Sequence, residues 1–341
     1  MTGELRPASL DEAQKILQGG RGSIAFVGGG TAIATRPAVE AVLYTGALDR
    51  IVDYAPSDQV VTVEAGVTLL ALQKECGKHG QRLALDVPLP DRATLGGIVA
   101  ANSFGPLRTR YGAVRDLIIG VSILRADGTR AKGGGKVVKT VAGFDLPKLM
   151  CGSRGTLGMI ATVTFRVHPL PEHGVDLVAR GLSAAAVIEL VRKLRSLQLE
   201  PAAMLATRTG GGWEVALRFE GFRAGVVQQR EKLSDLEEAP ESPWAAHLAA
   251  RGSVRFGALP TQLAEVEAAF AGGEISWYPT LGLGFAKAAG SARPALAALG
   301  GWLVDGADFG PPPAALPLHR AMKARLDPEG RLAPGTFLGG I

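Results

Sequence analysis

The most constraining stretch of this chain is residues 24–31, IAFVGGGT, where a short apolar run ends directly on three glycines and a threonine. The apolar run predicts a buried strand. The glycines lack a Cβ atom, so their backbone can take positive φ and bring N–H groups close to an anion, with the Thr31 hydroxyl as a further donor. On these residues alone, a tight turn and a phosphate-binding loop both stay open.

A dinucleotide-binding Rossmann unit does not fit the residues that follow. Such a unit needs a crossover helix that opens with the glycine motif and leads to the next parallel strand. The next strand-like run, residues 39–45, begins shortly after Thr31, and Pro37 lies in between. A pyrophosphate would therefore be held by the loop itself, and other parts of the chain would have to complete the site.

A second glycine-rich block spans residues 94–112, TLGGIVAANSFGPLRTRYG. Gly96 and Gly97 precede the small residues 98–101, which predicts a short helix packed against a flat surface. Its N-terminal N–H groups are expected to be free to receive an anion. A plain helix and turn with a solvated basic tail explains the same residues equally well.

A third glycine-rich block spans residues 142–158, AGFDLPKLMCGSRGTLG. Asp145 is expected to cap a short helix over residues 146–150. Three glycines then interrupt the chain before an alternating strand at residues 159–167. One glycine loop is explained by turn chemistry, whereas three loops in one half of the chain favour one extended ligand.

Composition narrows the class of protein. The chain has 341 residues, of which 47% are hydrophobic and 20% charged, which suggests two domains. The net charge of +5 comes from dispersed basic residues, so we expect no nucleic-acid partner. Cys76 and Cys151 form no C-x-x-C motif, which argues against a zinc site or an iron–sulfur cluster in this chain. Without a leader-like segment or a membrane-length apolar run, we expect a cytoplasmic protein with no direct membrane span.

The chain changes character around residues 169–174, where we expect a domain boundary. Residues 182–197 carry a helical apolar stripe that predicts a core-facing helix. The strands and helices that follow form two similar α/β halves, a weak repeat resembling a ferredoxin-like sandwich. A last helix is expected at residues 319–326.

These blocks resemble flavoproteins of the vanillyl-alcohol oxidase/PCMH type. The resemblance rests on VGGGT at 27–31, TLGGIVAANSFGPLRTRYGAVRDLIIGV at 94–121, KTVAGFDLPKLMCGSRGTLGMI at 139–160 and DPEGRLAPG at 327–335. It is closest to the FAD-binding E subunits of bacterial glycolate oxidases. It implies an α+β fold with a PCMH-type FAD-binding domain at 1–170, made of two α/β subdomains at about 1–54 and 55–170. An α/β (ferredoxin-like) cap domain would follow at 171–315, and a C-terminal segment, 316–341, would return to the FAD domain.

The resemblance also implies where FAD would lie. The first glycine loop would hold the pyrophosphate, the second block would face it and approach the flavin, and the third would contact the ribityl–adenosine end. The cofactor-binding residues implied in this way are Gly28, Gly29, Gly30, Thr31, Ala32, Thr94, Leu95, Gly96, Gly97, Asn102, Ser103, Gly105, Gly152, Ser153, Gly155, Thr156, Gly158 and Ile160.

The sequence departs from the family in three ways. Residues 27–35 contain no histidine, so non-covalent FAD is expected. The histidines are scattered and lack the His-rich metal motif of related catalytic subunits, so no metal site is expected. Thr140 and Ala333 stand where the family usually has asparagine, which weakens individual contacts.

Three functions remain in competition. The leading one is an FAD-binding oxidoreductase subunit of a glycolate oxidase-like complex. It would relay electrons from 2-hydroxy acid oxidation, between a second FAD-binding catalytic subunit and an iron–sulfur subunit, and would reach a membrane only through these partners.

The second is a self-sufficient FAD-dependent 2-hydroxy acid dehydrogenase, in which Arg108 or Arg110 holds the carboxylate of a small hydroxy acid. Glu214 and Glu220 lie in the cap, but nothing singles out either as a general base, so catalytic residues stay unassigned. The third is a non-catalytic flavin-fold scaffold, against which the intact GGGT and TLGG loops argue.

Overall fold

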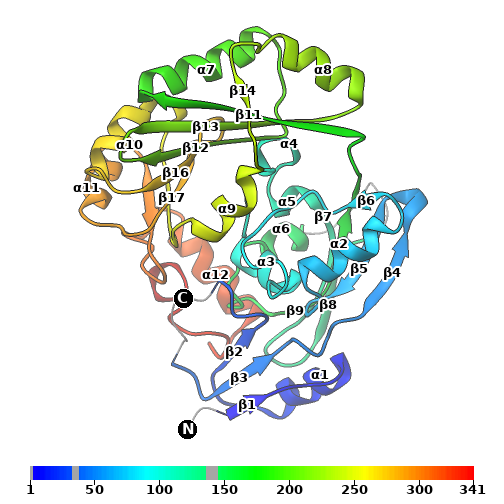
Figure 1. Cartoon of the computed structure of the whole chain (residues 1–341). Coiled ribbons are helices and arrows are strands. Elements are labelled where there is room, and N and C mark those ends of the chain that lie inside the picture. The colour runs from blue at the N-terminus through cyan, green and yellow to red at the C-terminus, as the bar shows by residue number, and fades with distance from the viewer. Residues whose placement is uncertain (1–2, 33–37, 136–144) are drawn as a thin grey trace. The chain divides into compact units, whose positions relative to one another are not determined.

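The computed structural model describes residues 3–32, 38–135 and 145–341, and its internal contacts divide the chain into two units. The first unit gathers Met1–Phe104, Gly112–Pro169 and Pro311–Ile341, and the second gathers Gly105–Tyr111 and Leu170–Gly310. Each unit combines sheets with helices (Figure 1), so the predicted α+β class is confirmed.

The first unit begins with a small parallel sheet of order β1-β3-β2. Its strands are β1 (Gly3–Leu5), β2 (Ile24–Val27) and β3 (Ala41–Tyr44), and helix α1 (Leu10–Gly19) packs beside it. The Ser9 hydroxyl accepts the Glu12 N–H at 3.2 Å, which confirms the predicted cap. No helix occurs among the described residues that connect β2 to β3.

The second sheet of this unit is antiparallel and has the order β4-β5-β9-β7-β8. Its strands are β4 (Ile51–Ala55), β5 (Val60–Glu64), β7 (Ile118–Leu124), β8 (Arg130–Gly134) and β9 (Met159–Arg166). Helices α2 (Leu69–Gly77), α3 (Leu95–Ala101), α5 (Val114–Leu117) and α6 (Leu146–Met150) share an apolar core with it. The subdomain boundary expected near residue 54 falls inside β4, which pairs with this sheet.

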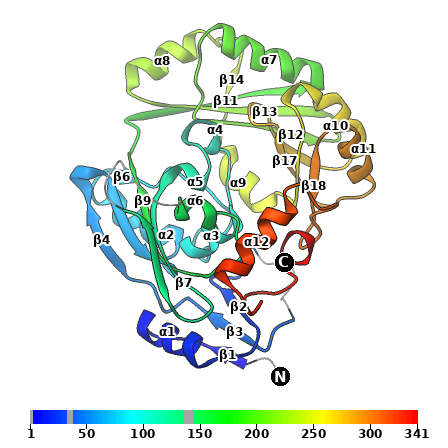
Figure 2. The same cartoon turned by 180° about the vertical axis from the view of Figure 1, so that it is seen from behind.

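Smaller elements complete the first unit. They are η1 (Pro56–Asp58), the antiparallel pair β6 (Gln81–Arg82) and β10 (His168–Pro169), helix α12 (Leu316–Leu326) and η3 (Leu338–Gly340). The Asp145 side chain accepts the Lys148 N–H at 3.2 Å, so the predicted cap of α6 is confirmed. In Figure 2, α12 and the C-terminus lie close together.

The second unit is built on an eight-stranded sheet of order β14-β11-β13-β12-β16-β17-β15-β18. Its strands are β11 (His173–Leu182), β12 (Ala203–Thr209), β13 (Gly212–Gly221), β14 (Glu237–Glu238), β15 (Val254–Gly257), β16 (Ile275–Tyr278), β17 (Leu283–Ala286) and β18 (Trp302–Val304). Each half follows a β-α-β-β-α-β path with the same strand order, and β12 pairs with β16 to join them. The predicted pair of ferredoxin-like halves is therefore confirmed.

Helices of the two halves pack into one apolar core with this sheet. They are α7 (Ala184–Ser196), α8 (Arg223–Glu231), α10 (Leu263–Ala269) and α11 (Ala292–Ala298), while η2 (Pro260–Gln262) and α4 (Arg108–Tyr111) are short. Helix α9 (Pro243–Ala250) contacts the other face, because His247 bonds to Tyr278, whose neighbour Trp277 points into the core. The sequence analysis did not predict this helix.

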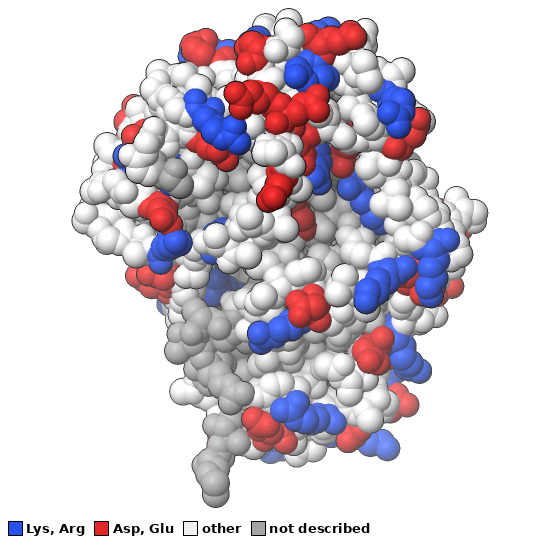
Figure 3. Space-filling model, in the orientation of Figure 1, with Lys and Arg blue, Asp and Glu red and all other residues white. Residues whose placement is uncertain are grey.

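Two further observations concern helix length and surface charge. Among the described helices, none is both long and apolar enough to cross a bilayer. Blue and red side chains alternate over the face shown in Figure 3, so that face has mixed charge.

Candidate functional site

The first glycine loop, residues 28–31, leaves β2 and lies directly against the residues before α3. A Cβ atom on Gly28 would lie 1.9 Å from the Thr94 hydroxyl oxygen, and one on Gly29 would lie 1.7 Å from the Arg92 carbonyl oxygen. Only glycine permits so close an approach. The structure therefore brings the first and second glycine-rich blocks together.

The N–H groups of the first glycine loop have no acceptor among the described residues. Gly30 lies at φ +68°, and the space where its Cβ would stand is open. Several unbonded N–H groups in a glycine loop form a concavity that suits an anion. The loop thus retains the donors that a pyrophosphate needs.

The N–H groups at the start of α3 are already bonded within the fold. The N–H groups of Leu95 and Gly96 donate at 2.8 Å to backbone carbonyls of residues 67 and 65, and Gly97 donates to the Thr94 hydroxyl at 3.3 Å. The expectation of free donors there is therefore wrong. A Cβ on Gly96 would lie 2.6 Å from the Ala65 Cβ, so this glycine allows close packing.

The third glycine loop, residues 152–158, is attached to the end of α3. The N–H groups of Gly152 and Arg154 donate to the carbonyls of Val99 and Ala100, both at 2.9 Å. These bonds fix the third glycine loop to α3. The residues directly before α3 contact the first glycine loop. The third block therefore joins the other two.

A tight turn follows within the third glycine loop. Arg154 and Gly155 have φ of +51° and +79°, and the Thr156 N–H returns to the Ser153 carbonyl at 2.9 Å. A Cβ on Gly155 would lie 3.3 Å from the Phe26 ring on β2. The turn thus borders the strand that leads into the first glycine loop.

Two predicted residues carry buried polar atoms with no partner among the described residues, Asn102 Oδ1 and Ser153 Oγ. Their stretches adjoin, because a Cβ on Gly152, the residue before Ser153, would lie 3.6 Å from the Asn102 Cβ. Asn102 takes the left-handed conformation, φ +48°, where α3 ends. Buried polar atoms in folded proteins nearly always have partners, so these two fit a polar ligand such as FAD.

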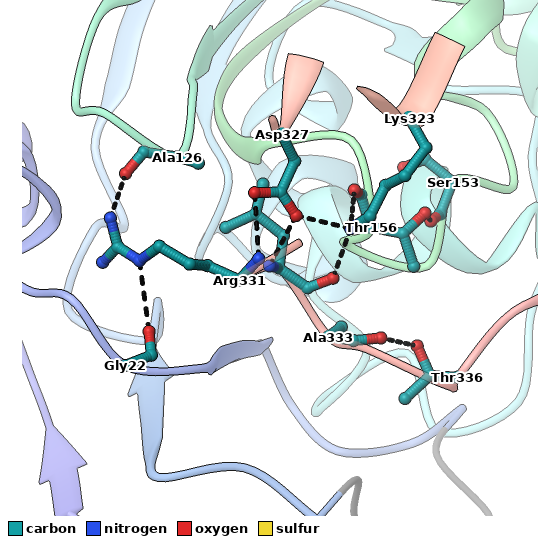
Figure 4. Close-up of polar contacts among 10 residues, drawn as sticks. Gly22, Ala126, Ser153, Thr156, Lys323, Asp327, Arg331, Ala333 and Thr336 are labelled. Atoms are coloured by element: carbon teal, nitrogen blue, oxygen red, sulfur yellow. Dashed lines mark hydrogen bonds and ion pairs between the residues drawn. The ribbon is translucent and has the colours of Figure 1, made fainter. Parts of the chain in front are cut away.

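The C-terminal segment supports this region from the other side (Figure 4). The Arg331 carbonyl accepts the Ile24 N–H, and the Ala333 N–H donates to the Ile24 carbonyl, both at 2.8 Å. The Arg331 guanidinium donates to the carbonyls of Gly22 at 3.2 Å and Ala126 at 2.9 Å. Residues 331–333 therefore extend the small sheet beside β2.

Lys323 links this segment to the third glycine loop (Figure 4). Its ammonium donates to Asp327 at 2.6 Å, to the Leu332 carbonyl at 2.7 Å and to the Thr156 carbonyl at 2.8 Å. Asp327, 1% exposed, also accepts the N–H groups of Arg331 and Leu332. All three ammonium protons are used, so Lys323 positions the Thr156 turn.

The sequence interpretation passed over Lys323 and Arg154. Only the charge of Lys323 beside the DPEG motif could have drawn attention to it. Burial lowers the pKa of Arg154, and burial raises the pKa of Cys151 to about 12, so this thiol stays protonated. A partly desolvated cation within the third glycine loop suits an anionic ligand.

Other predicted residues have different environments. Leu95 is fully buried in the apolar core, Ile160 pairs with Ile123 on the neighbouring strand, and Ala32 is exposed. Gly105 belongs to the second unit. Thr140 lies outside the described residues.

Three of the side chains considered for substrate chemistry, those of Arg110, Glu214 and Glu220, are engaged within the second unit. Arg110 donates to the Glu220 carbonyl at 3.0 Å, and the Tyr111 hydroxyl donates to the Glu220 carboxylate at 3.1 Å. Glu214 pairs with Arg180 at 2.9 Å. In the part of the chain that the structure describes, no group of His, Cys, Asp and Glu has the arrangement of a metal site.

Comparison with known proteins adds the following. The model of the FAD binding domain family matches residues 2–134. Glycolate oxidase subunit GlcE of Escherichia coli (strain K12) is 32% identical over 239 residues, which cover 69% of this chain and 64% of that protein. The mitochondrial D-lactate dehydrogenase (cytochrome) of Arabidopsis thaliana is 30% identical over 207 residues, 58% of this chain and 36% of that protein. The aligned regions thus span under two thirds of either relative.

A solved structure of an alkyldihydroxyacetonephosphate synthase superposes with a TM-score of 0.72 at 16% identity, covering 97% of this chain and 75% of that one. At this identity the likeness concerns the fold.

Proposed function

We propose, from the premise that residues 2–134 are an FAD binding domain of the PCMH type, that this chain is an FAD-dependent oxidoreductase subunit of a glycolate oxidase-like complex. The observation that carries the proposal is the convergence of the three glycine-rich blocks. It combines N–H groups at residues 28–31 with buried Asn102 Oδ1 and Ser153 Oγ, none of which has a partner in the part of the chain that the structure describes.

In this proposal the chain's own residues bind and orient FAD. N–H groups of the first glycine loop donate to the diphosphate, and Arg154 offsets part of its charge. Asn102 and Ser153 direct their polar atoms to the cofactor. No covalent bond is required. Bound FAD supplies a ring that accepts electrons from a substrate or another redox centre.

The proposed role is electron relay between a second FAD-binding catalytic subunit, which oxidises the hydroxy acid, and an iron–sulfur subunit. One observation supports a relay over direct substrate oxidation. Arg110 donates to the Glu220 carbonyl, and the Glu220 carboxylate accepts a hydrogen bond from the Tyr111 hydroxyl, so both side chains are engaged within the fold. The E. coli relative carries the name of a glycolate oxidase subunit.

A second candidate is a self-sufficient 2-hydroxy acid dehydrogenase. The similarity to a D-lactate dehydrogenase favours it. In that case the isolated chain would oxidise a hydroxy acid without partners.

A spectroscopic experiment separates these functions. The purified chain is expected to show flavin absorbance that is released by acid, as for non-covalent FAD. A protein that stays colourless with added FAD would refute the flavoprotein assignment. Anaerobic glycolate or D-lactate should leave the flavin of the isolated chain oxidised, and reduction should require the co-purified partners. Bleaching of the isolated chain would instead favour the dehydrogenase.

A further inference from the structure

An exposed apolar segment precedes and begins helix α12. Every residue from 311 to 318, PPPAALPL, is apolar, and all except Leu316 are exposed. Leu318 is 67% exposed to solvent. Single exposed apolar side chains are ordinary, but a contiguous run marks an interaction surface.

An apolar cavity of about 180 Å³ opens beside this segment. Thr156 and His319 line it together with the apolar side chains of Leu149, Leu157, Leu318, Met322, Phe337 and Ile341. A cavity of roughly 150 Å³ lined by such side chains holds a benzene molecule in another protein. The cavity therefore has room for one aromatic or branched aliphatic side chain.

The charges of α12 are all of one sign. The helix contains Arg320 and Arg325 and no acidic residue. Both arginines are exposed, and neither forms an ion pair with another described residue. Exposed Arg130 and Arg180 elsewhere do pair with carboxylates. The Arg320 guanidinium donates to the Gly339 carbonyl at 3.5 Å, so Arg325 is the group that complements an acidic ligand beside the apolar cavity.

The spacing places the cavity-lining side chains and Arg325 on one side of the helix, whereas Arg320, two residues after Leu318, lies on the other side. Leu318, Met322 and Arg325 stand at i, i+4 and i+7, so they share a face. Leu318 and Met322 line the cavity. An apolar anchor in the cavity would thus lie next to a guanidinium group.

We infer that this surface, consisting of α12, residues 311–315 and the adjoining cavity, docks a segment of a partner protein. The segment inserts one aromatic or aliphatic side chain into the cavity and places a flanking carboxylate on Arg325. A bilayer would meet a broad flat surface, whereas a cavity sized for one side chain is typical of a protein–protein anchor. The inference rests on the proposed role as a subunit of a complex.

The test uses a photo-activated amino acid, p-benzoylphenylalanine, at position 318 of the full chain in the cells that naturally make it. Irradiation is expected to join position 318 to another protein, through a peptide with Asp or Glu close to an apolar residue. The same probe at Val52, which is 53% exposed on β4, is the matched control and should give no such adduct.

Charge reversal tests the electrostatic part. In the probe-bearing chain, Arg325→Glu should lower the adduct yield about tenfold, as loss of one charge-assisted contact implies. Arg21→Glu, at another exposed arginine of the same unit, should leave the yield unchanged. Equal yields for both variants would overturn the inference.

The remaining outcomes are also decisive. Adducts only with lipid, only with a second copy of this chain, or absent altogether would overturn the docking surface. Leu318→Asp should retain its flavin, and loss of flavin in this variant alone would assign the cavity to the cofactor site. Absence of flavin from the unmodified chain would instead refute the proposed function, so the two failures are distinguishable.

Discussion

Two glycine-rich stretches of similar composition have different structural roles in this molecule. The glycines of the first glycine loop leave N–H groups without acceptors among the described residues. Those at the start of α3, Gly96 and Gly97, donate their N–H groups to the Ala65 carbonyl and the Thr94 hydroxyl. The first stretch presents donors, whereas the second provides a close-packed support.

The difference lies in what each glycine contacts. Gly29 lies against the Arg92 carbonyl, so the residues before α3 shape the first glycine loop, which presents the N–H donors. Gly96 approaches Ala65 in the interior. Substitutions in the two stretches should therefore affect different properties, namely cofactor binding in the first and stability in the second.

The largest effect is expected from Gly29→Ala. The new Cβ would lie 1.7 Å from the Arg92 carbonyl oxygen, so the loop must move. Displacement removes several hydrogen bonds to a charged acceptor, each contributing about 1.5–3 kcal/mol. We expect the flavin absorbance per protein to fall to near background. Gly46→Ala, where the Cβ position is open, is the control and should keep its flavin. Normal flavin content in Gly29→Ala would remove this loop from the site.

The next effect concerns the C-terminal support of the same region. Lys323→Met leaves the Asp327 carboxylate, fully buried as a side chain, without its cation. Breaking a buried pair in this way costs about 3–5 kcal/mol of unfolding free energy. Urea denaturation should show this loss. Lys148→Met, which breaks an exposed pair with Asp145, should cost about 0–1 kcal/mol. Equal losses in both variants would contradict a positioning role for Lys323.

Local patterns made much of the fold predictable. The caps at Ser9 and Asp145 and the repeated order of elements in the second unit all follow from short-range signals. Helix α9 was missed because its run PWAAHLAA is apolar all round and shows no amphipathic period.

The site was predictable only in part, because its contacts are long-range. Motifs identified which loops to consider, and the structure brings their backbones together. Whether an N–H group is free depends on an acceptor elsewhere, such as the Ala65 carbonyl for Gly96. The bond from Lys323 to Thr156 spans 167 positions of the chain. Spacing within a motif contains no information about such partners.

A moderate effect is expected from Gly96→Ala, which sharpens the contrast between the two stretches. The added methyl group would meet the Ala65 Cβ at 2.6 Å, and overpacking of this kind costs about 1–3 kcal/mol of unfolding free energy. Thermal denaturation should report the loss. The dissociation constant for FAD, measured while the protein is folded, should stay near the wild-type value. A large rise in that constant with unchanged stability would place α3 among the donors.

The smallest effect is expected from Ser153→Ala. This change should raise the stability of the apo protein and weaken FAD binding. The Ser153 hydroxyl is buried and lacks a partner among the described residues, so the apo protein gains about 1 kcal/mol or less when it is removed. If FAD supplies the partner, the same change weakens FAD binding by about 0.5–1.5 kcal/mol, roughly two- to tenfold in the dissociation constant. Ser122→Ala removes a hydroxyl that bonds to Thr162 at 2.5 Å and is the control, since it should lower stability and leave FAD affinity unchanged. A Ser153→Ala protein that is less stable but binds FAD normally would show that this hydroxyl serves the fold, and the third glycine loop would then meet the cofactor through its backbone alone.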